Sequence, residues 1–248
     1  QNFSWMTVVA AMGQMFYSLS IAMGILYTYG SYMKKEVDIE QSTKQVEVFD
    51  TAIAMLAGLM VIPAVFAFSG GDPDTLKAGP SLMFITIPKV FASMGFGTAA
   101  GIMFFLLVLL AALTSAISLA ESGVSTFEDQ LGWSRRRSTV LMGAIILCFG
   151  AASALGFGMW DFVTLLGMSI LDFFDFLTNS LMMPIAALAT CLLVTRVVGL
   201  ERIVEEVEQS SGFRRKRMYC FFMKYMAPVC IVIILLSSIA GVLGWISI

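Results

Sequence analysis

The sequence predicts an all-α integral membrane protein with six transmembrane helices, and three observations support this fold class. Of its 248 residues, 58% are hydrophobic and only 13% are charged, whereas about a quarter of the residues of a soluble domain are charged. Six apolar stretches are long enough to cross a bilayer as helices, which takes about 20 residues. These stretches do not alternate in polarity with period two, as the strands of a membrane β-barrel would.

The six predicted spans form a single transmembrane domain fragment over residues 1–248. They cover residues 5–33, 48–68, 97–120, 138–155, 172–194 and 218–245. Within residues 69–94, an apolar piece is too short to span and is interrupted by Pro88, so we expect an external re-entrant loop that folds back as short helices. The sequence begins with Gln1 and enters an apolar helix almost at once, which favours a fragment of a longer protein.

Positive charge is distributed unequally over the connections between the spans. Of the 15 Lys and Arg residues, all but Lys77 and Lys89 lie after the first, third or fifth span, or just inside the sixth. The positive-inside rule places these connections in the cytoplasm. We therefore expect a multi-pass protein of the plasma membrane whose N-terminus and C-terminus are both extracellular.

The composition excludes several classes of activity. The chain has no histidine and a formal net charge of −2, which argues against most zinc chemistry, Ser-His and Cys-His catalytic pairs, and nucleic acid as a partner. The four cysteines form no CxxC motif and are interpreted as small hydrophobic residues. Ala120–Gly123 faintly resembles a serine-protease elbow, but the chain lacks a histidine or an evident general base, so we do not expect an enzyme.

The first predicted span is longer than one straight crossing needs, and Ser18, Ser20 and Gly24 lie near its middle. Transporters unwind helices at such positions, which frees carbonyl groups and half-helix ends to bind ions. Close helix packing is the alternative, because small residues are common where membrane helices meet. The residues alone leave both interpretations open.

Hydroxyl groups line one face of the third predicted span. The spacing i, i+3, i+4, i+7 and beyond brings together Ala111, Thr114, Ser115, Ser118 and Ser122. Neutral oxygen ligands of this kind suit a hard cation such as Na⁺. The alternative is that these hydroxyls bond back to carbonyls of their own helix, as is frequent in membrane helices.

Ionisable residues within spans are costly and are therefore candidates for function. Asp50 lies a turn into the second span and is followed by an uncharged stretch up to Phe68. Glu121 could pair with a basic residue on a helix that this chain lacks. Asp172 and Asp175 could be solvated at the interface or could cap a helix start, where the helix dipole favours an anion.

Five ordered motifs together resemble the neurotransmitter:sodium symporter family, whose bacterial members carry amino acids. They are GQMFYSLSIAMGILYTYGSY (residues 13–32), FDTAIAMLAGLMVIPAVFAF (49–68), KAGPSLMFITIP (77–88), LAALTSAISL (110–119) and LDFFDF (171–176). The resemblance covers essentially the whole chain and corresponds to the sixth through eleventh membrane helices. It implies the second half of an inverted-repeat, leucine-transporter-like fold, with a first span that is discontinuous over Ser18–Met23.

The resemblance also implies roles for individual residues. Substrate-pocket positions of the family match Tyr17, Ser18, Ser20, Met23, Ser115 and Leu119. Ligands of two sodium ions, each site only partly formed by this chain, match Ser18, Asp50, Ala111, Thr114 and Ser115. Asp175 matches the acidic half of the outer gate, Asp129 matches that of the inner gate, and Tyr32 matches a tyrosine that supports the inner gate.

Asp50 departs from the family pattern, because the family often has Asn at this sodium-ligand position. Chloride-dependent members place an anion beside it, and a resident carboxylate could replace that chloride. Two unit charges a few Å apart interact by about 4 kcal/mol at an effective dielectric near 20. The nearby position that holds Glu in some chloride-independent relatives is Ala54 here. We therefore expect no chloride requirement, with Asp50 acting alone.

The sequence thus predicts a part of a sodium-coupled symporter that works by alternating access. The apolar side chains of Tyr17, Met23 and Leu119 favour a neutral, bulky hydrophobic or aromatic amino acid. The lipid bilayer is the expected surrounding, and the five preceding family helices are expected to be needed for function. A non-transporting homologue that acts as a scaffold or regulatory subunit is the alternative.

Overall fold

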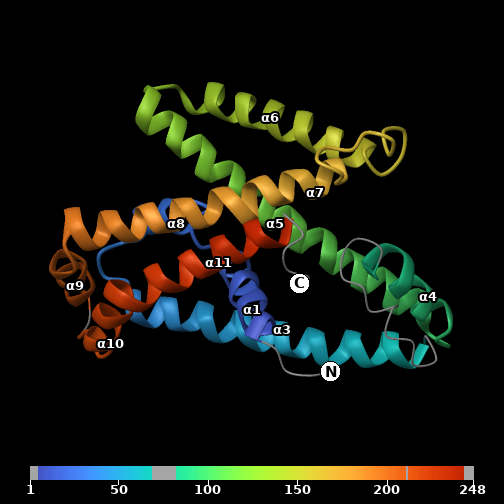
Figure 1. Ribbon diagram of the computed structural model, residues 1–248, viewed down its shortest axis with the longest axis horizontal. Helices are drawn as coiled ribbons and strands as arrows, with labels where there is room; N and C mark the ends of the chain where they lie inside the picture. The colour runs from blue at the N-terminus through green and yellow to red at the C-terminus, as the bar shows by residue number, and fades with distance from the viewer. Residues whose placement is uncertain (1–4, 69–81, 211, 243–248) are drawn as a thin grey trace. The chain divides into compact units, whose positions relative to one another are not determined.

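The computed structural model describes residues 5–68, 82–210 and 212–242 (Figure 1). Apart from an isolated β-bridge between Leu165 and Met168, all regular structure in these residues is helical. Five helices within them are long and apolar enough to cross a membrane. The predicted external loop falls partly on residues 69–81, and the predicted extracellular C-terminus on residues 243–248, which lie outside the described residues.

Three of the five long helices are regular. They are α3 (Ile39–Phe68), α5 (Gly97–Leu131) and α6 (Arg135–Leu155). Between α3 and α5 lie the short helical segments η2 (Leu82–Thr86) and α4 (Ile87–Ala92).

The other two long helices contain π-helical turns. Residues 170–198 consist of α7 (Ile170–Asp175), η3 (Phe176–Met182), α8 (Met183–Leu192) and η4 (Leu193–Val198). Residues 216–242 consist of α10 (Lys216–Phe221), η5 (Phe222–Met226) and α11 (Ala227–Val242). The amphipathic helix α9 (Leu200–Glu208) connects the two and buries Val204 and Val207.

The first predicted span is discontinuous, as expected. It consists of α1 (Trp5–Ser18), a non-helical stretch over residues 19–24, and α2 (Ile25–Tyr32). At a rise of about 1.5 Å per residue, neither helix alone reaches the thickness of a bilayer core, which is about 30 Å. That α1 and α2 cross the membrane together remains a prediction.

The chain forms two compact units, which are described separately. The larger unit comprises residues 1–44 and 118–248, and the smaller comprises residues 45–117. In the larger unit, α8 lies beside α11 (Figure 1), and the buried side chains of Ala187, Cys191 and Ile231 form a core between them. Phe16 and Ala22 pack against this core. Hydrophobic packing thus anchors both α1 and the interrupted stretch after it.

The smaller unit positions the first part of α5 by close packing around Phe91. The rings of Phe91 and Phe104 lie 5.5 Å apart. A Cβ atom at Gly97 would lie 1.6 Å from the carbonyl oxygen of Phe91, so only glycine fits at this helix start.

Candidate functional site

The interruption after α1 is built from left-handed backbone conformations. Ser20, Ala22 and Gly24 have φ values of 54°, 63° and 81°. Instead of continuing the helical ladder, the N–H of Ser20 donates to the carbonyl of Tyr17 and the N–H of Ile21 to that of Phe16, both at 3.0 Å. Left-handed conformations are unfavourable for residues other than glycine, so the surrounding fold holds this break in place.

The break leaves polar backbone groups available. Among the described residues, the carbonyl oxygens of Leu19, Ser20 and Ile21 accept no hydrogen bond. The end of α1 and the start of α2 also bring together a partial negative and a partial positive helix end. Such an arrangement suits a cation and a carboxylate bound next to each other.

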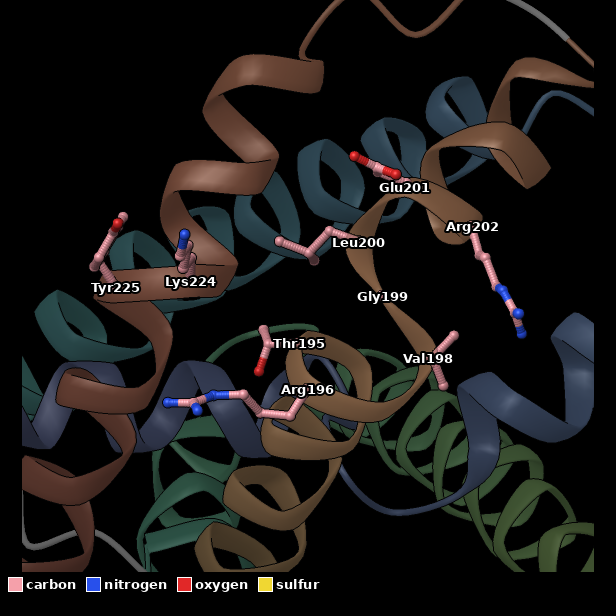
Figure 2. A pocket seen from close by; sticks show the side chains of 9 residues that line it. All are labelled: Thr195, Arg196, Val198, Gly199, Leu200, Glu201, Arg202, Lys224 and Tyr225. Atoms are coloured by element: carbon pink, nitrogen blue, oxygen red, sulfur yellow. The ribbon is translucent and has the colours of Figure 1, made fainter.

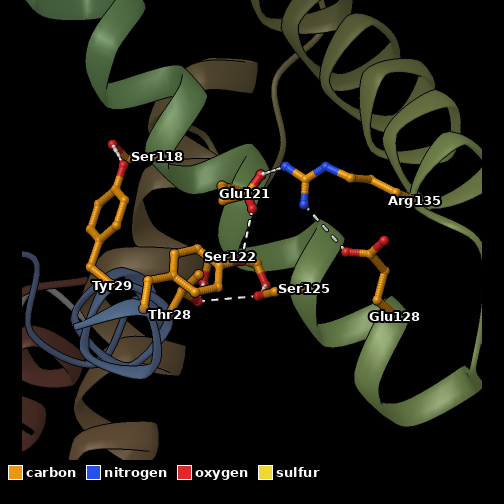
Figure 3. Close-up of polar contacts among 9 residues, drawn as sticks. Thr28, Tyr29, Ser118, Glu121, Ser122, Ser125, Glu128 and Arg135 are labelled. Atoms are coloured by element: carbon orange, nitrogen blue, oxygen red, sulfur yellow. Dashed lines mark hydrogen bonds and ion pairs between the residues drawn. The ribbon is translucent and has the colours of Figure 1, made fainter. Parts of the chain in front are cut away.

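Hydroxyl groups link α2, which follows the break, to α5 (Figure 3). Thr28 and Ser122 are buried, and their hydroxyl oxygens lie 3.5 Å apart. Ser122 also donates to the carbonyl of Met23 at 3.4 Å, and Thr28 pairs with Ser125 at 3.3 Å. A Cβ atom at Gly24 would lie 2.3 Å from the Ser122 hydroxyl oxygen. Glycine at position 24 thus suits both the positive φ and this close approach.

Tyr17 and Asp175 line the same cavity, which has a volume of about 280 Å³. The cavity lies among α1, the α7–α8 helix and α11, and its other polar side chains are Gln14, Asn179, Ser180 and Ser238. The Asn179 amide donates a hydrogen bond to the Asp175 carboxylate. The structure thus brings a predicted substrate residue and the predicted outer-gate acid together. Met23 and Leu119 are not among the residues lining this cavity.

A charged network joins α2, α5 and α6 around Glu121 (Figure 3). The Tyr32 hydroxyl donates to one carboxylate oxygen of Glu121 at 2.8 Å, and Arg135 donates to the other at 2.7 Å. Arg135 also contacts Glu128 at 3.4 Å. The suggestion that Glu121 pairs with a helix outside this chain is therefore wrong in this structure, because its partner is Arg135 at the start of α6.

Sequence reasoning missed Glu128 and Arg135 as members of this network, although one signal was available. Glu121, Ser125 and Glu128 follow helical spacing on α5. Tyr32, predicted to support the inner gate, contacts Glu121 rather than Asp129. Asp129 is exposed near the end of α5 and makes no hydrogen bond or ion pair within the described residues.

The predicted ligands of the second sodium ion are neighbours on α5. The Thr114 hydroxyl donates to the carbonyl of Ala111 at 2.9 Å. Its hydrogen is thus bonded back to a carbonyl of its own helix, as the alternative interpretation expects. Both oxygens retain lone pairs, and Ala111, Thr114 and Ser115 are all exposed. These three residues and Asp50 belong to the smaller unit, whereas Ser18 belongs to the larger. The two sodium sites therefore remain predictions.

Comparison with known proteins places these features in a family. A model of the sodium:neurotransmitter symporter family matches residues 4–244. The chain is 31% identical over 241 residues to the uncharacterized sodium-dependent transporter YhdH of Bacillus subtilis, covering 96% of this chain and 52% of the relative. It is also 31% identical over 232 residues to an uncharacterized sodium-dependent transporter of Haemophilus influenzae, covering 93% and 50% of the two chains.

A solved structure agrees with these sequence matches. The crystal structure of MhsT in complex with L-phenylalanine superposes with a TM-score of 0.83 at 35% identity, covering 93% of this chain and 51% of that one. The chain thus spans about half the length of the relatives it matches. With its membrane-length helices, the match over residues 4–244 shows that this multi-pass membrane chain belongs to the sodium:neurotransmitter symporter family, whose members are transporters and not enzymes.

Proposed function

We propose that the whole protein is a symporter that couples inward sodium movement to the uptake of a neutral, bulky hydrophobic or aromatic amino acid. The observation that carries this proposal is the break between α1 and α2, with carbonyl groups that have no partner in the described residues. Family membership supplies the sodium dependence. This chain contributes about half of each site, and the helices missing from it complete them.

In this mechanism, sodium and substrate meet at the break. Ser18 and Asp50 contribute oxygen ligands to the first sodium ion, and the substrate carboxylate completes its shell beside Ser20. Ala111, Thr114 and Ser115 hold the second sodium ion. Both ions stabilise the same outward-facing state, so binding of sodium and of substrate is mutually favourable.

The side chain of the substrate is selected by apolar contacts. Tyr17, Met23 and Leu119 form an adaptable wall, because methionine fills irregular gaps and aromatic rings offer large contact areas. Ser115 also faces the substrate. The L-phenylalanine held by MhsT supports an aromatic substrate.

Alternating access follows from gates on the two sides of the site. Asp175, in the cavity with Tyr17, closes the outer side with an arginine on the missing first helix. Asp129 closes the inner side with an arginine on the missing N-terminus. We place the protein in the plasma membrane with the cationic connections in the cytoplasm and the C-terminus outside. The Tyr32–Glu121–Arg135 network then lies on the inner side and ties α2 to α5 and α6.

Uptake by the full-length protein in liposomes tests this proposal. An inward sodium gradient is expected to drive accumulation of radiolabelled L-phenylalanine above its external concentration. Replacing external sodium with potassium is expected to abolish accumulation. Equal accumulation in both salts would contradict the proposal, and absence of both uptake and sodium-dependent binding would favour a scaffold role.

Transport is expected to be independent of chloride, because the Asp50 carboxylate supplies the negative charge beside the first sodium. Exchanging chloride for gluconate should leave uptake by the wild-type protein unchanged. Asp50→Asn should raise the half-saturating sodium concentration about tenfold or more, since removing one unit charge a few Å away weakens binding by more than 1.4 kcal/mol. Glu47→Gln, one turn earlier on α3, is the matched control. A chloride requirement in the wild type would refute the assignment of Asp50.

Glu121→Gln is expected to weaken closure of the inner side, because the neutral amide replaces a carboxylate bonded at 2.8 Å and 2.7 Å. Arg135 is 60% exposed, so solvent screens the ion pair and the expected effect is modest. A roughly fivefold increase in the half-saturating sodium concentration follows. Glu128→Gln removes only the 3.4 Å contact with Arg135. This variant should change the half-saturating sodium concentration less than about twofold. Identical behaviour of the two variants would contradict this role of Glu121.

A further inference from the structure

A second, larger cavity lies where the two π-containing helices approach the connection that carries α9. Its volume is about 880 Å³, and all its lining residues belong to the larger unit. Thr195 and Arg196 line it from η4, and Lys224 and Tyr225 line it from η5 (Figure 2). The cavity is thus distinct from the one beside Asp175, with which it shares no residue.

The cavity carries positive charge that the described part of the chain does not neutralise. Among the described residues, the side chains of Arg196 and Lys224 make no ion pair or hydrogen bond, and the Lys224 ammonium lies 5.5 Å from the Tyr225 ring centroid. Arg202 and Glu201 also line the cavity, and their opposite charges offset each other. Lys216, on the same helix as Lys224, does have an acidic partner, Glu208 at 3.2 Å.

Both cations lie near the ends of helices that are long and apolar enough to cross a membrane. Arg196 lies two residues before the end of the apolar helix Ile170–Val198, and Lys224 lies eight residues after the start of the helix Lys216–Gly241. At about 1.5 Å per residue, Lys224 lies roughly 12 Å along its helix. A charged side chain within a membrane-spanning helix is costly unless it is paired or reaches the headgroup region.

We propose that this cavity binds the headgroup phosphate of an anionic glycerophospholipid. The Arg196 guanidinium and the Lys224 ammonium pair with the phosphate oxygens. The Thr195 hydroxyl donates to the carbonyl of Cys191 at 2.7 Å and would accept a hydrogen bond from the headgroup, as would the Tyr225 hydroxyl, which also lines the cavity. The acyl chains extend along the lipid-facing helices. This inference rests on the membrane location of the chain and not on sodium coupling or on the choice of amino acid.

The test uses the full-length protein purified in a neutral detergent and titrated with dihexanoyl-phosphatidylglycerol while its thermal unfolding is followed. We expect a saturable rise in Tm for the wild type and no comparable rise with dihexanoyl-phosphatidylcholine or inorganic phosphate. Arg196→Gln combined with Lys224→Gln is expected to raise the half-saturating lipid concentration about tenfold or more, because two charge-assisted contacts are lost.

Two control variants separate specific binding from a general loss of charge or of folding. Arg217→Gln removes one charge from exposed α10 without altering the cavity, and it should respond like the wild type. Arg196→Lys combined with Lys224→Arg keeps both charges and should retain most of the response. The proposal is overturned if the wild type shows no rise in Tm, if inorganic phosphate acts as well as the lipid, or if Arg217→Gln loses as much affinity as the double Gln variant.

Discussion

Gly24→Ala is expected to lower sodium-driven uptake by the full-length protein more than about tenfold while leaving the protein in the membrane. Gly24 has a φ of 81°, and a Cβ atom there would lie 2.3 Å from the Ser122 hydroxyl oxygen. The left-handed conformation alone costs a residue with a side chain about 1–2 kcal/mol. The steric conflict adds to this cost, so we expect uptake to fall more than about tenfold.

Gly30→Ala is the matched control for this prediction. Gly30 lies in α2, and a Cβ atom there would meet nothing within 4 Å. Because alanine favours helix over glycine by about 1 kcal/mol, this variant should transport like the wild type. Adding Ser122→Gly to Gly24→Ala should restore part of the uptake by removing the conflict. If Gly24→Ala alone transports as well as the wild type, sodium-driven uptake does not depend on the backbone geometry of the break.

Thr114→Val combined with Ser115→Ala is expected to eliminate the dependence of substrate binding on the second sodium ion. Valine matches threonine in shape but offers no oxygen, and a hard cation that loses two oxygen ligands is not retained by the remaining carbonyl of Ala111. We expect a more than tenfold rise in the half-saturating sodium concentration and a loss of sigmoidal sodium dependence. Equilibrium binding of radiolabelled sodium measures this directly.

Thr126→Val serves as the control for the α5 variants. The Thr126 hydroxyl donates to the Ser122 carbonyl of its own helix at 2.8 Å, so its replacement removes a back-bonded hydroxyl outside the predicted sodium site. Sodium binding should then change little. If Thr126→Val and the double variant impair sodium binding to the same extent, the α5 hydroxyls act only through helix geometry and not as ligands.

The break was predicted from the resemblance to the family, because the residues alone left unwinding and close helix packing both open. Ser18, Ser20 and Gly24 lie near the middle of a span that exceeds one crossing, and the structure interrupts the helix over residues 19–24. The positive φ of Ala22 was not predictable from its residue type, since alanine favours helix. It depends on tertiary packing, because Ala22 contacts the core of α8 and α11.

The ion pair between Glu121 and Arg135 was not predictable, because helical spacing on α5 points only to neighbours on α5 itself, such as Glu128. Arg135 follows Glu121 by 14 residues, and the two meet only because α5 and α6 are joined by the short turn at residues 132–134, where Gly132 has a φ of 62°. Helical periodicity does place Ala111, Thr114 and Ser115 on one face, and the Thr114–Ala111 contact of 2.9 Å agrees with that grouping.

If sodium and an amino acid bind cooperatively at the interrupted span, the affinity of the full-length protein for L-phenylalanine must be higher in sodium than in potassium. We predict that sodium raises this affinity at least about tenfold, and that saturating L-phenylalanine raises the affinity for sodium by the same factor, as linkage requires. Equal affinity for L-phenylalanine in the two salts, in a protein that binds it, would contradict the account.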